Sequence, residues 1–400
     1  MNNIHTKNYN LGEGKIALIH DHLAQLGGAE KVLQVLADIY PSAPIYTLLY
    51  KQEYIDKFFN DKKIISSFIQ KMPLGIKKYQ WYMPLMASAI ESYDLSNFNF
   101  VISSASSFAK GVITQPETTH ICYCHTPTRY LWHYNNQYLE ELKMPKFIKQ
   151  TINFYISYVR QWDLSTINRV DHFIANSKTT QARIKKYYLR DSAVIYPPVD
   201  TNKFKISQEQ GDYFLTGGRL TPYKRFDLAI KTFNKLGIPL KIFGEGPDLR
   251  RLKKMANNNI EFLGRISEVE KTEYLSACRA FIHPQEEDFG ITAVEAMASG
   301  RPVIAFNKGG ATETIIHGQT GILFNEQTWE ELADVILRFL YKQKFEFNSE
   351  FIKQYAEKFG AERFKREIEQ YVNFINNKSL LAPRERGLSL PAGKAGVREL

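Results

Sequence analysis

Hydrophobic residues along the chain fall into short continuous runs that alternate with stretches of helical spacing. In the first half, such runs are typical of strands buried on both faces, and between residues 29 and 40 Val32, Leu33, Leu36 and Ile39 recur on one helical face. Strands that alternate with helices predict a parallel sheet covered by helices on both sides. The expected strands are 15–20, 45–49, 100–104, 120–124, 172–176 and 193–196.

The alternation stops at residues 196–204, where two adjacent prolines are followed by a polar stretch. Proline stiffens such a segment and is excluded from helices and central strands, so we expect a linker between domains. The alternation then restarts, with a helix from about Phe226 to Leu236 and two helical patterns near 350–359 and 361–376. The expected strands of this second sheet are 213–218, 240–244, 260–264, 280–284, 302–306 and 321–324.

The pattern therefore predicts two doubly wound α/β domains in tandem. We expect a first Rossmann-like domain over 1–198, a second over 199–360, and a helix over 361–378 that packs back on the first domain. Residues 379–400 are rich in Gly and Pro and lack aromatic residues, which predicts a disordered tail. Ligands of such sheets bind outside the carboxyl ends of the strands, so the cleft between the domains is the expected site.

Composition narrows the class of protein without identifying a partner. The net charge of +10 is compatible with nucleic acid, an anionic membrane or a phosphorylated substrate, but the lysines are spread along the whole chain and no nucleic-acid-binding motif is present. Cys122, Cys124 and Cys278 are the three cysteines, and their spacing fits buried thiols rather than a zinc site. The polar N-terminus and the lack of a long apolar run favour a cytoplasmic protein.

The turn after the first strand of the second domain carries glycines and two cations. Gly217 and Gly218 let a ligand approach the backbone closely, and Arg219 and Lys224 flank the turn that contains Pro222. Two cations held on a strand-to-helix turn suit a diphosphate, because each charge-assisted contact contributes roughly 1.5–3 kcal/mol. A solvated basic turn is the alternative interpretation of this stretch.

The stretch "EEDFGITAVEAMASG" (286–300) places Glu287 in a loop and Glu295 about one and a half turns into a helix that begins near Phe289 or Gly290. The helix N-terminus offers free amide donors to a phosphate or a sugar hydroxyl. A carboxylate accepts hydrogen bonds from two hydroxyls at once, so both glutamates suit a sugar or a ribose. The alternatives are a loop acid with a solvated helix acid, or a metal site, for which no further ligand cluster is evident.

The first domain offers weaker signals at two strand ends. Gly27 and Gly28 open the first helix and predict a loop that closes over phosphate or an acceptor. His125 ends a strand, so the edge rule places it toward the cleft, with Arg129 shortly after it. A histidine at a strand end is more often structural, and that alternative stays open.

The motif "HPQEEDFGITAVEAMASGRPVIAFNKGGATETI" resembles the E-x7-E signature of the family-four retaining glycosyltransferases, whose GT-B fold has two Rossmann-like domains. The resemblance extends to "GGRLTPYKRFD", "GEGPDLRRL", "FLGRIS", the linker "YPPVDTNKF" and the "GGAE" loop. "CHTPTRYLW" is similar to the form found in bacterial polysaccharide and O-antigen mannosyltransferases. A two-Rossmann sugar-nucleotide epimerase and a non-catalytic membrane-attached nucleotide-sugar-binding module are the alternatives.

The resemblance implies roles residue by residue. Arg219 and Lys224 would neutralise the donor pyrophosphate, Glu295 would bind the ribose, and Glu287 would contact the transferred sugar. His125 would lie beside that sugar, and Arg129 would contact the sugar or the acceptor. The remaining donor-binding positions are Gly27, Gly28, Gly244, Arg265, Ile266, Phe289 and Gly290.

It also implies retention of anomeric configuration without a metal or a cofactor, because cations and a helix dipole stabilise the leaving group. The expected donor is GDP-mannose, with a UDP-sugar as the alternative. The expected acceptor is a polyprenyl-diphosphate-linked or growing surface polysaccharide, such as lipopolysaccharide.

Residues 57–86 combine six lysines and one aspartate with aromatic and aliphatic residues. This composition is typical of a surface that lies on an anionic leaflet, which predicts peripheral binding at the inner face of the plasma membrane. A packed helical excursion with a basic outer face is the alternative.

Overall fold

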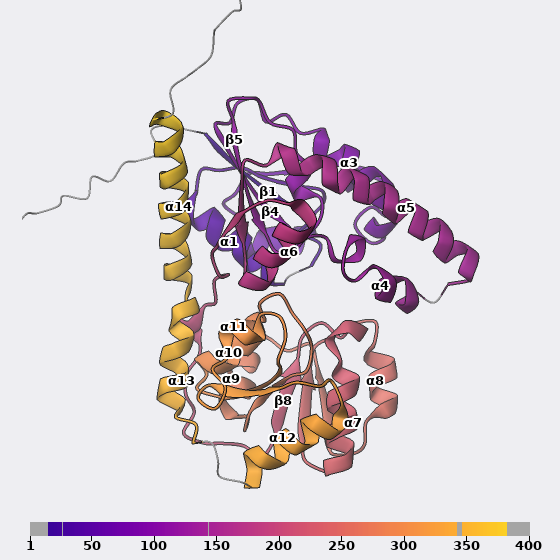
Figure 1. The fold of residues 1–400 in the computed structure, drawn as a ribbon, viewed down its shortest axis with the longest axis vertical. Coiled ribbons are helices and arrows are strands. Elements are labelled where there is room, and N and C mark those ends of the chain that lie inside the picture. The colour runs from indigo at the N-terminus through magenta and orange to yellow at the C-terminus, as the bar shows by residue number, and fades with distance from the viewer. Residues whose placement is uncertain (1–14, 26, 143, 342–345, 382–400) are drawn as a thin grey trace, which may run out of the picture.

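The computed structural model describes residues 15–25, 27–142, 144–341 and 346–381, which form two α/β domains, one above the other in Figure 1. The sheet of the first domain has the strand order β3-β2-β1-β4-β5-β6-β7 and is parallel throughout. Its strands are β1 (Ile16–His20), β2 (Ile45–Thr47), β3 (Ile64–Ser66), β4 (Phe100–Ala105), β5 (Thr119–Cys124), β6 (His172–Ala175) and β7 (Ser192–Val194).

Both faces of this sheet are covered by helices, as continuous apolar strands require. One face packs against α1, through Val32, Leu33 and Leu36, and the other packs against α3, α5 and α6. Figure 1 shows α4 and α5 extending away from the body of the domain. The helices are α1 (Gly28–Ile39), α2 (Gln52–Phe58), α3 (Met83–Glu91), α4 (Asn135–Glu141), α5 (Lys146–Ser165) and α6 (Lys178–Tyr188).

The second domain repeats this architecture with a parallel sheet of order β10-β9-β8-β11-β12-β13. Its strands are β8 (Phe214–Gly217), β9 (Leu240–Phe243), β10 (Ile260–Gly264), β11 (Phe281–His283), β12 (Val303–Phe306) and β13 (Gly321–Phe324). One face packs against α7 (Phe226–Leu236), α8 (Leu249–Met255) and α12 (Trp329–Tyr341), and the other against α9 (Glu268–Ala277), α10 (Ile291–Ala298), α11 (Ala311–Thr314) and α13 (Ser349–Ala356).

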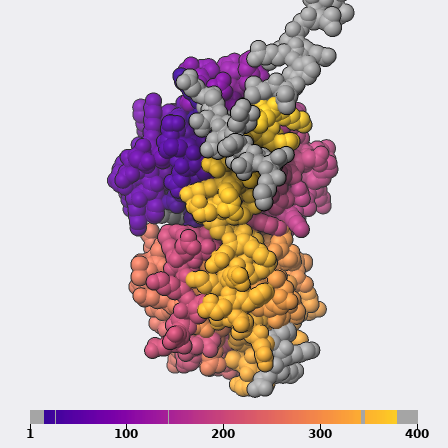
Figure 2. Space-filling model, turned by 90° about the vertical axis from the view of Figure 1, so that its left-hand side faces the viewer, coloured from indigo at the N-terminus to yellow at the C-terminus, as the bar shows by residue number. Residues whose placement is uncertain are grey.

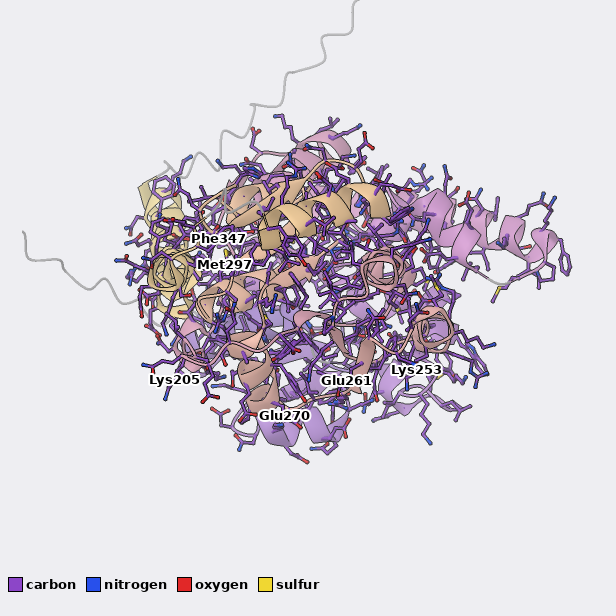
Figure 3. The ribbon with its side chains drawn as sticks, turned by 90° about the horizontal axis from the view of Figure 1, so that it is seen from below. Lys205, Lys253, Glu261, Glu270, Met297 and Phe347 are labelled. Carbon is purple, nitrogen blue, oxygen red and sulfur yellow. The ribbon has the colours of Figure 1, made fainter. Side chains whose placement is uncertain are left out.

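Figure 3 views the second domain from below. Met297, a residue of α10, is buried in the core, whereas the charged side chains that the figure labels are exposed. These exposed side chains are Lys205, Lys253, Glu261 and Glu270. These four charged side chains therefore face solvent.

The chain crosses between the domains twice. The linker runs beside the end of α13, where the Val199 amide donates to the carbonyl of Phe359 over 2.9 Å. The chain then returns through α14 (Ala361–Leu381), whose residues Phe364, Ile368 and Val372 join the core of the first domain. Figure 2 shows α13 and α14, in yellow, running over both domains on one side.

The C-terminal helix thus continues to Leu381, past the boundary at 378 that the sequence pattern predicts. Our prediction of a disordered tail over 379–400 is wrong for 379–381, which lie in the last turn of this helix. From 382 on, the predicted tail lies outside the described residues.

Residues 57–86 are less helical than the packed helical excursion that is the alternative interpretation of this segment. They contain the end of α2, strand β3, two short 3-10 turns (Phe68–Lys71 and Tyr79–Tyr82) and the start of α3. Strand β3 is missing from our sequence prediction because three residues within a basic aromatic stretch show no alternation. Among the described residues, no helix is long and apolar enough to cross a bilayer.

Candidate active site in the interdomain cleft

The carboxyl ends of the two sheets face each other, and side chains from both domains meet between them. Arg219 donates to the Oε1 of Gln25 over 2.8 Å, and Lys31 donates to Glu295 over 2.6 Å. Gly28, at the start of α1, lies against Ile291, at the start of α10. The structure therefore has a closed cleft, with most of the sequence-predicted residues along its walls.

The turn after β8 is shaped by glycines that pack against each other. Gly244 has φ of +113°, and a Cβ there would lie 1.9 Å from the carbonyl oxygen of Gly218. A Cβ on Gly246 would lie 2.2 Å from the carbonyl oxygen of Leu220. Gly244 and Gly246 therefore support the turn that carries Arg219 and Lys224, and close backbone contact explains why that loop needs glycine.

Lys224 and Glu287 form an ion pair at the centre of the second domain's wall. Their side chains lie 2.8 Å apart and are 14% and 16% exposed. Burial works to raise the pKa of Glu287, but Lys224 and then His283 outweigh it and lower the pKa to about 2. Glu287 is therefore a carboxylate at any physiological pH, and the position predicted for a sugar contact carries a fixed negative charge.

Arg219 differs from Lys224 in its partner. Its guanidinium meets the neutral amide of Gln25, and no carboxylate in the described part of the chain pairs with it. Its positive charge is therefore available to an anionic ligand.

The α10 helix begins at the bottom of the cleft. Gly290 precedes it with φ of +89°, a left-handed conformation that favours glycine. The side chain of Phe289 is buried and packs against Tyr196 and, edge to face, against Phe359, with ring centroids 5.7 and 5.5 Å away. At these two positions the backbone, rather than a side chain, is what remains available to a ligand; the donor-binding role of Phe289 and Gly290 stays a prediction.

Glu295 is buried between two lysines from different elements. Lys31 of α1 lies 2.6 Å away and Lys271 of α9 lies 3.2 Å away. Burial opposes the charge of Glu295, but the two lysines outweigh it and lower its pKa. A cavity of about 610 Å³, lined by Lys31, Glu268, Glu295 and residues of the linker and of α14, opens beside this carboxylate.

Arg265 and Ile266 lie in the loop between β10 and α9. Arg265 is exposed, Ile266 packs against the core, and Ser267 then caps α9 in a reciprocal pair with Glu270. This cap fixes the start of the helix that carries Lys271 to Glu295. The loop is therefore connected to Glu295 through one helix.

His125 is buried at the end of β5. Its Nε2 and the hydroxyl of Ser104 are 2.8 Å apart, and that hydroxyl is 3.2 Å from Nδ1 of His20. Burial lowers the pKa of His125 to about 4, so the ring is neutral near pH 7. The structure thus joins His125 to His20 and, through a 3.7 Å contact of His20, to Glu30.

Arg129 contacts the other domain. Its guanidinium pairs with Asp288 and lies over the ring of Tyr223, 5.2 Å from the centroid. Arg183 of α6 pairs with the same carboxylate. Asp288, which lies in the chain between the predicted residues Glu287 and Phe289, is thus a residue of the cleft.

Sequence reasoning missed Lys31, Lys271, Arg183 and Asp288. Lys31 directly follows the "GGAE" motif, which was the available signal for it. The contact of Lys31 with Glu295 joins residues 264 positions apart, a pairing that local patterns cannot reveal. Among the described residues, no cluster of three or more His, Cys, Asp or Glu side chains is arranged to hold a metal.

Two family models match the chain in adjacent segments. The model "Glycosyltransferase Family 4" matches residues 26–203, and the model "Glycosyl transferases group 1" matches residues 199–358. Together they span both domains and the cleft. The boundary between the two matches falls in the linker.

Curated relatives are similar at modest identity. An uncharacterized glycosyltransferase, MJ1178 of Methanocaldococcus jannaschii, is 30% identical over 48% of this chain and 56% of its own length. The alpha-1,3/1,6-mannosyltransferase ALG2 of Mus musculus is 26% identical over 62% of this chain and 66% of its own length. The matched segments thus span about half to two thirds of these relatives.

Solved structures share the fold over nearly the whole chain. HepE of Anabaena, solved with UDP and glucose, has a TM-score of 0.69 at 19% identity, covering 90% of this chain and 99% of that one. The sucrose-phosphate synthase of Thermosynechococcus elongatus has a TM-score of 0.71 at 17% identity, covering 91% and 100%. Both family models, the two facing parallel sheets and these neighbours agree: the chain belongs to the family-four glycosyltransferases, with the GT-B fold.

Proposed function

We propose that the protein is a retaining, metal-independent hexosyltransferase that moves mannose from GDP-mannose to a lipid-linked or growing surface polysaccharide. The observation that carries the proposal is the convergence of Arg219, Lys224, Glu287 and Glu295 around the start of α10. Cations and backbone amides suit the diphosphate of a nucleotide sugar, and the two carboxylates suit the ribose and the sugar that this diphosphate joins.

The diphosphate would bind between Arg219 and Lys224. Arg219 has no carboxylate partner in the described chain, and Lys224 has three N–H donors, so it can keep Glu287 while it donates to a phosphate oxygen. The first amides of α10 would add donors and a positive dipole end. As the leaving diphosphate gains charge, these groups stabilise the transition state more than the ground state.

Glu295 would accept the ribose hydroxyls, with the base near the backbone of Arg265 and Ile266. The carboxylate is already charged and buried, and Lys31 and Lys271 flank it. When ribose hydroxyls arrive, the two lysines keep the carboxylate ionised while it gains neutral donors. The adjoining cavity offers room beside the carboxylate.

The sugar would lie between Glu287 and the first domain, near His125 and Arg129. Glu287 accepts hydrogen bonds from sugar hydroxyls, because it cannot donate a proton at physiological pH. The leaving phosphate oxygen is the base that takes the acceptor proton, on the face from which the nucleotide departs. The acceptor then attacks that same face, and the configuration is retained.

Mannose is favoured by the names of relatives. Mannosyltransferases are among them, including the GDP-mannose-dependent phosphatidylinositol monomannoside mannosyltransferase of Mycobacterium tuberculosis, 31% identical over 30% of this chain. The structural neighbour HepE, in contrast, was solved with UDP and glucose. A UDP-sugar is therefore the alternative donor.

The acceptor would be presented at an anionic membrane, the cytoplasmic face of the plasma membrane. No Asp or Glu occurs in residues 62–90, and exposed Leu74 and Trp81 alternate there with exposed lysines. In the same segment, the ring of Tyr79 lies 5.0 Å from that of His22, which follows β1 at the edge of the cleft. A lipid-linked acceptor bound here would reach the cleft directly.

The membrane contact is tested by sedimentation with vesicles. We expect binding to vesicles containing anionic lipid, release in salt, and weaker binding of Leu74→Ser/Trp81→Ser, because both apolar and ionic contacts contribute. Tyr341→Ser, which removes an exposed aromatic residue of the second domain, is the matched control. Equal binding to neutral vesicles would contradict the electrostatic part.

The reaction is tested by proton NMR of the products formed from GDP-mannose, UDP-glucose and UDP-N-acetylglucosamine, with EDTA present. We expect one donor to be consumed, an α-configured product, and strongly reduced turnover in Glu287→Gln. A new epimer of the intact donor would establish the epimerase alternative. Intact donors in every reaction, with lipid-linked acceptor supplied, would favour the non-catalytic module.

A further inference from the structure

The three consecutive acids 286–288 contact different parts of the molecule. Glu287 pairs with Lys224 of its own domain, whereas Asp288 pairs with Arg129 and Arg183 of the first domain. Glu286 adds a 2.7 Å contact to Arg183. The carboxylate that faces the expected sugar thus has a neighbour in the chain that is held by the opposite wall of the cleft.

Asp288 is the more buried member of this contact. Its side chain is 7% exposed, and the two arginines surround it. Burial opposes its ionisation, but Arg129 and then Arg183 outweigh that effect and lower its pKa. A buried carboxylate needs such partners, so separating the domains would leave an unpaired charge at the cleft surface.

The loop around these acids is held on the donor side mainly through its backbone. The Gly310 amide donates to the carbonyl of Glu287 over 2.8 Å, and a Cβ on Gly309 would lie 2.2 Å from that oxygen. The side chain of Asp288 leaves this loop in the opposite direction, toward the first domain. Contact between the domains therefore acts directly on the residue next to Glu287.

A second contact holds the same helix of the first domain. Glu313 accepts the backbone amides of Lys178 and Thr179, at 2.7 and 2.8 Å, at the start of α6. Since Arg183 lies in α6, this carboxylate fixes the helix that delivers the arginine to Asp288. The two contacts make α6 one of the bridges between the domains.

We propose that Asp288 is a positioning residue that aligns Glu287 with the transferred sugar only while Arg129 and Arg183 hold it across the closed cleft. Turnover then requires domain contact, whereas donor binding to the second domain does not. This inference rests on the proposed function of Glu287.

The test compares Asp288→Asn, Arg183→Gln and their double variant with Asp191→Asn. Asp191 pairs with Lys185 of the same helix, but on the exposed surface, so it is a matched control. Melting temperatures establish that each variant folds. The readouts are kcat, donor KM and Kd, and hydrogen exchange of the amides of residues 284–291 in the free protein.

We expect kcat to fall roughly 10- to 100-fold in each single variant, as displaced catalytic groups do, with donor Kd nearly unchanged. The double variant should be no worse than the worse single variant, because both remove one contact. Exchange in 284–291 should rise in these variants and stay unchanged in Asp191→Asn. Unchanged kcat, fully additive losses, or a loss confined to donor affinity would each overturn the proposal.

Failure of the proposed function has a different signature. The wild type would then show no turnover with any donor, and the exchange measurement alone would decide the structural part. Unchanged protection of 284–291 in Asp288→Asn would overturn the link between the domain contact and this loop.

Discussion

At the scale of single residues, the cleft contains charges that are buried and paired before any ligand binds. The Lys224–Glu287 pair and Glu295, which contacts Lys31 and Lys271, are examples. Burying a charge is costly, and breaking a buried pair leaves the remaining charge without compensation. We therefore propose that these pairs serve ligand binding rather than stability.

Removing one partner of the Lys224–Glu287 pair should show separately how the pair affects stability and donor binding. Lys224→Met should lower the free energy of unfolding by about 3 kcal/mol, because Glu287 is left uncompensated, and it should also weaken donor binding. The double variant Lys224→Met/Glu287→Leu should recover much of the stability but not the binding. Urea denaturation and calorimetry measure the two quantities. Recovery of donor affinity in the double variant would contradict the role given to Lys224.

The residues predicted from the sequence share a local signal. Arg219, Lys224, Glu287 and Glu295 belong to short motifs whose spacing and residue types are enough for a prediction. Arg183 and Asp288 act through partners more than a hundred positions away, and only the fold brings them together. His125 was placed at the correct strand end, but its bond to Ser104 depends on sheet register, which the sequence pattern does not give.

At the scale of elements, α1 and α10 approach each other across the cleft at their N-terminal ends. A Cβ on Gly28 would lie 2.7 Å from Cδ1 of Ile291. Glycine at this position therefore permits the closed arrangement. Gly28 thus has a packing role that is independent of any ligand.

A larger side chain at position 28 should keep the two domains from closing over the cleft. Gly28→Val should reduce turnover roughly tenfold or more, since a small displacement of catalytic groups is costly, while the melting temperature changes little. Adding Ile291→Ala should restore turnover by giving the new side chain room. Kinetic assays of both variants measure this. No rescue by Ile291→Ala would indicate that Gly28 acts through ligand contact instead.

The loops behind the Arg219 turn should be sensitive to a single methyl group. Gly244→Ala should destabilise the second domain by about 3 kcal/mol or more, from left-handed strain and overlap with Gly218. Gly237→Ala is the matched control, because Gly237 also has positive φ (+68°) but nothing lies within 4 Å of its Cβ position. Gly237→Ala should lower the free energy of unfolding by only about 1 kcal/mol. Equal losses in urea denaturation would contradict the packing argument.

The elements predicted best are the long apolar runs and the helices with regular stripes. Helix α7 covers the predicted 226–236, and every expected strand has a counterpart. Strand β3 could not be recognised, because its three residues pair only at the edge of the sheet beside β2. Short edge strands are defined by their neighbour rather than by their own pattern.

At the scale of the whole molecule, α14 connects the two domains and buried histidines make the first domain sensitive to acid. His120 and His125 are buried, and burial lowers the pKa of each to about 4. Because the unfolded pKa is higher, near 6.5, protons bind the unfolded chain first as the pH falls. Stability is therefore retained above pH 6.5 and lost progressively toward pH 4.

Each of these histidines should reduce the stability of the first domain by about 2 kcal/mol between pH 7 and pH 5. His120→Gln, in the core and outside the cleft, should show a correspondingly smaller loss over this range. Urea denaturation followed by tryptophan fluorescence reports on this domain, which contains Trp81, Trp132 and Trp162 of the four tryptophans. The same pH dependence in the variant and the wild type would contradict this assignment.

The central claim, that a nucleotide sugar binds with its diphosphate at Arg219 and Lys224, is tested most directly by calorimetric titration. The donors are GDP-mannose, UDP-glucose, UDP-N-acetylglucosamine and ADP-glucose, titrated into the wild type, Arg219→Met and the control Lys231→Met, which removes an exposed lysine of α7. We predict that one donor binds the wild type and the control equally, and binds Arg219→Met about 10- to 100-fold more weakly. Equal affinity in Arg219→Met, or no binding of any donor, would contradict the claim.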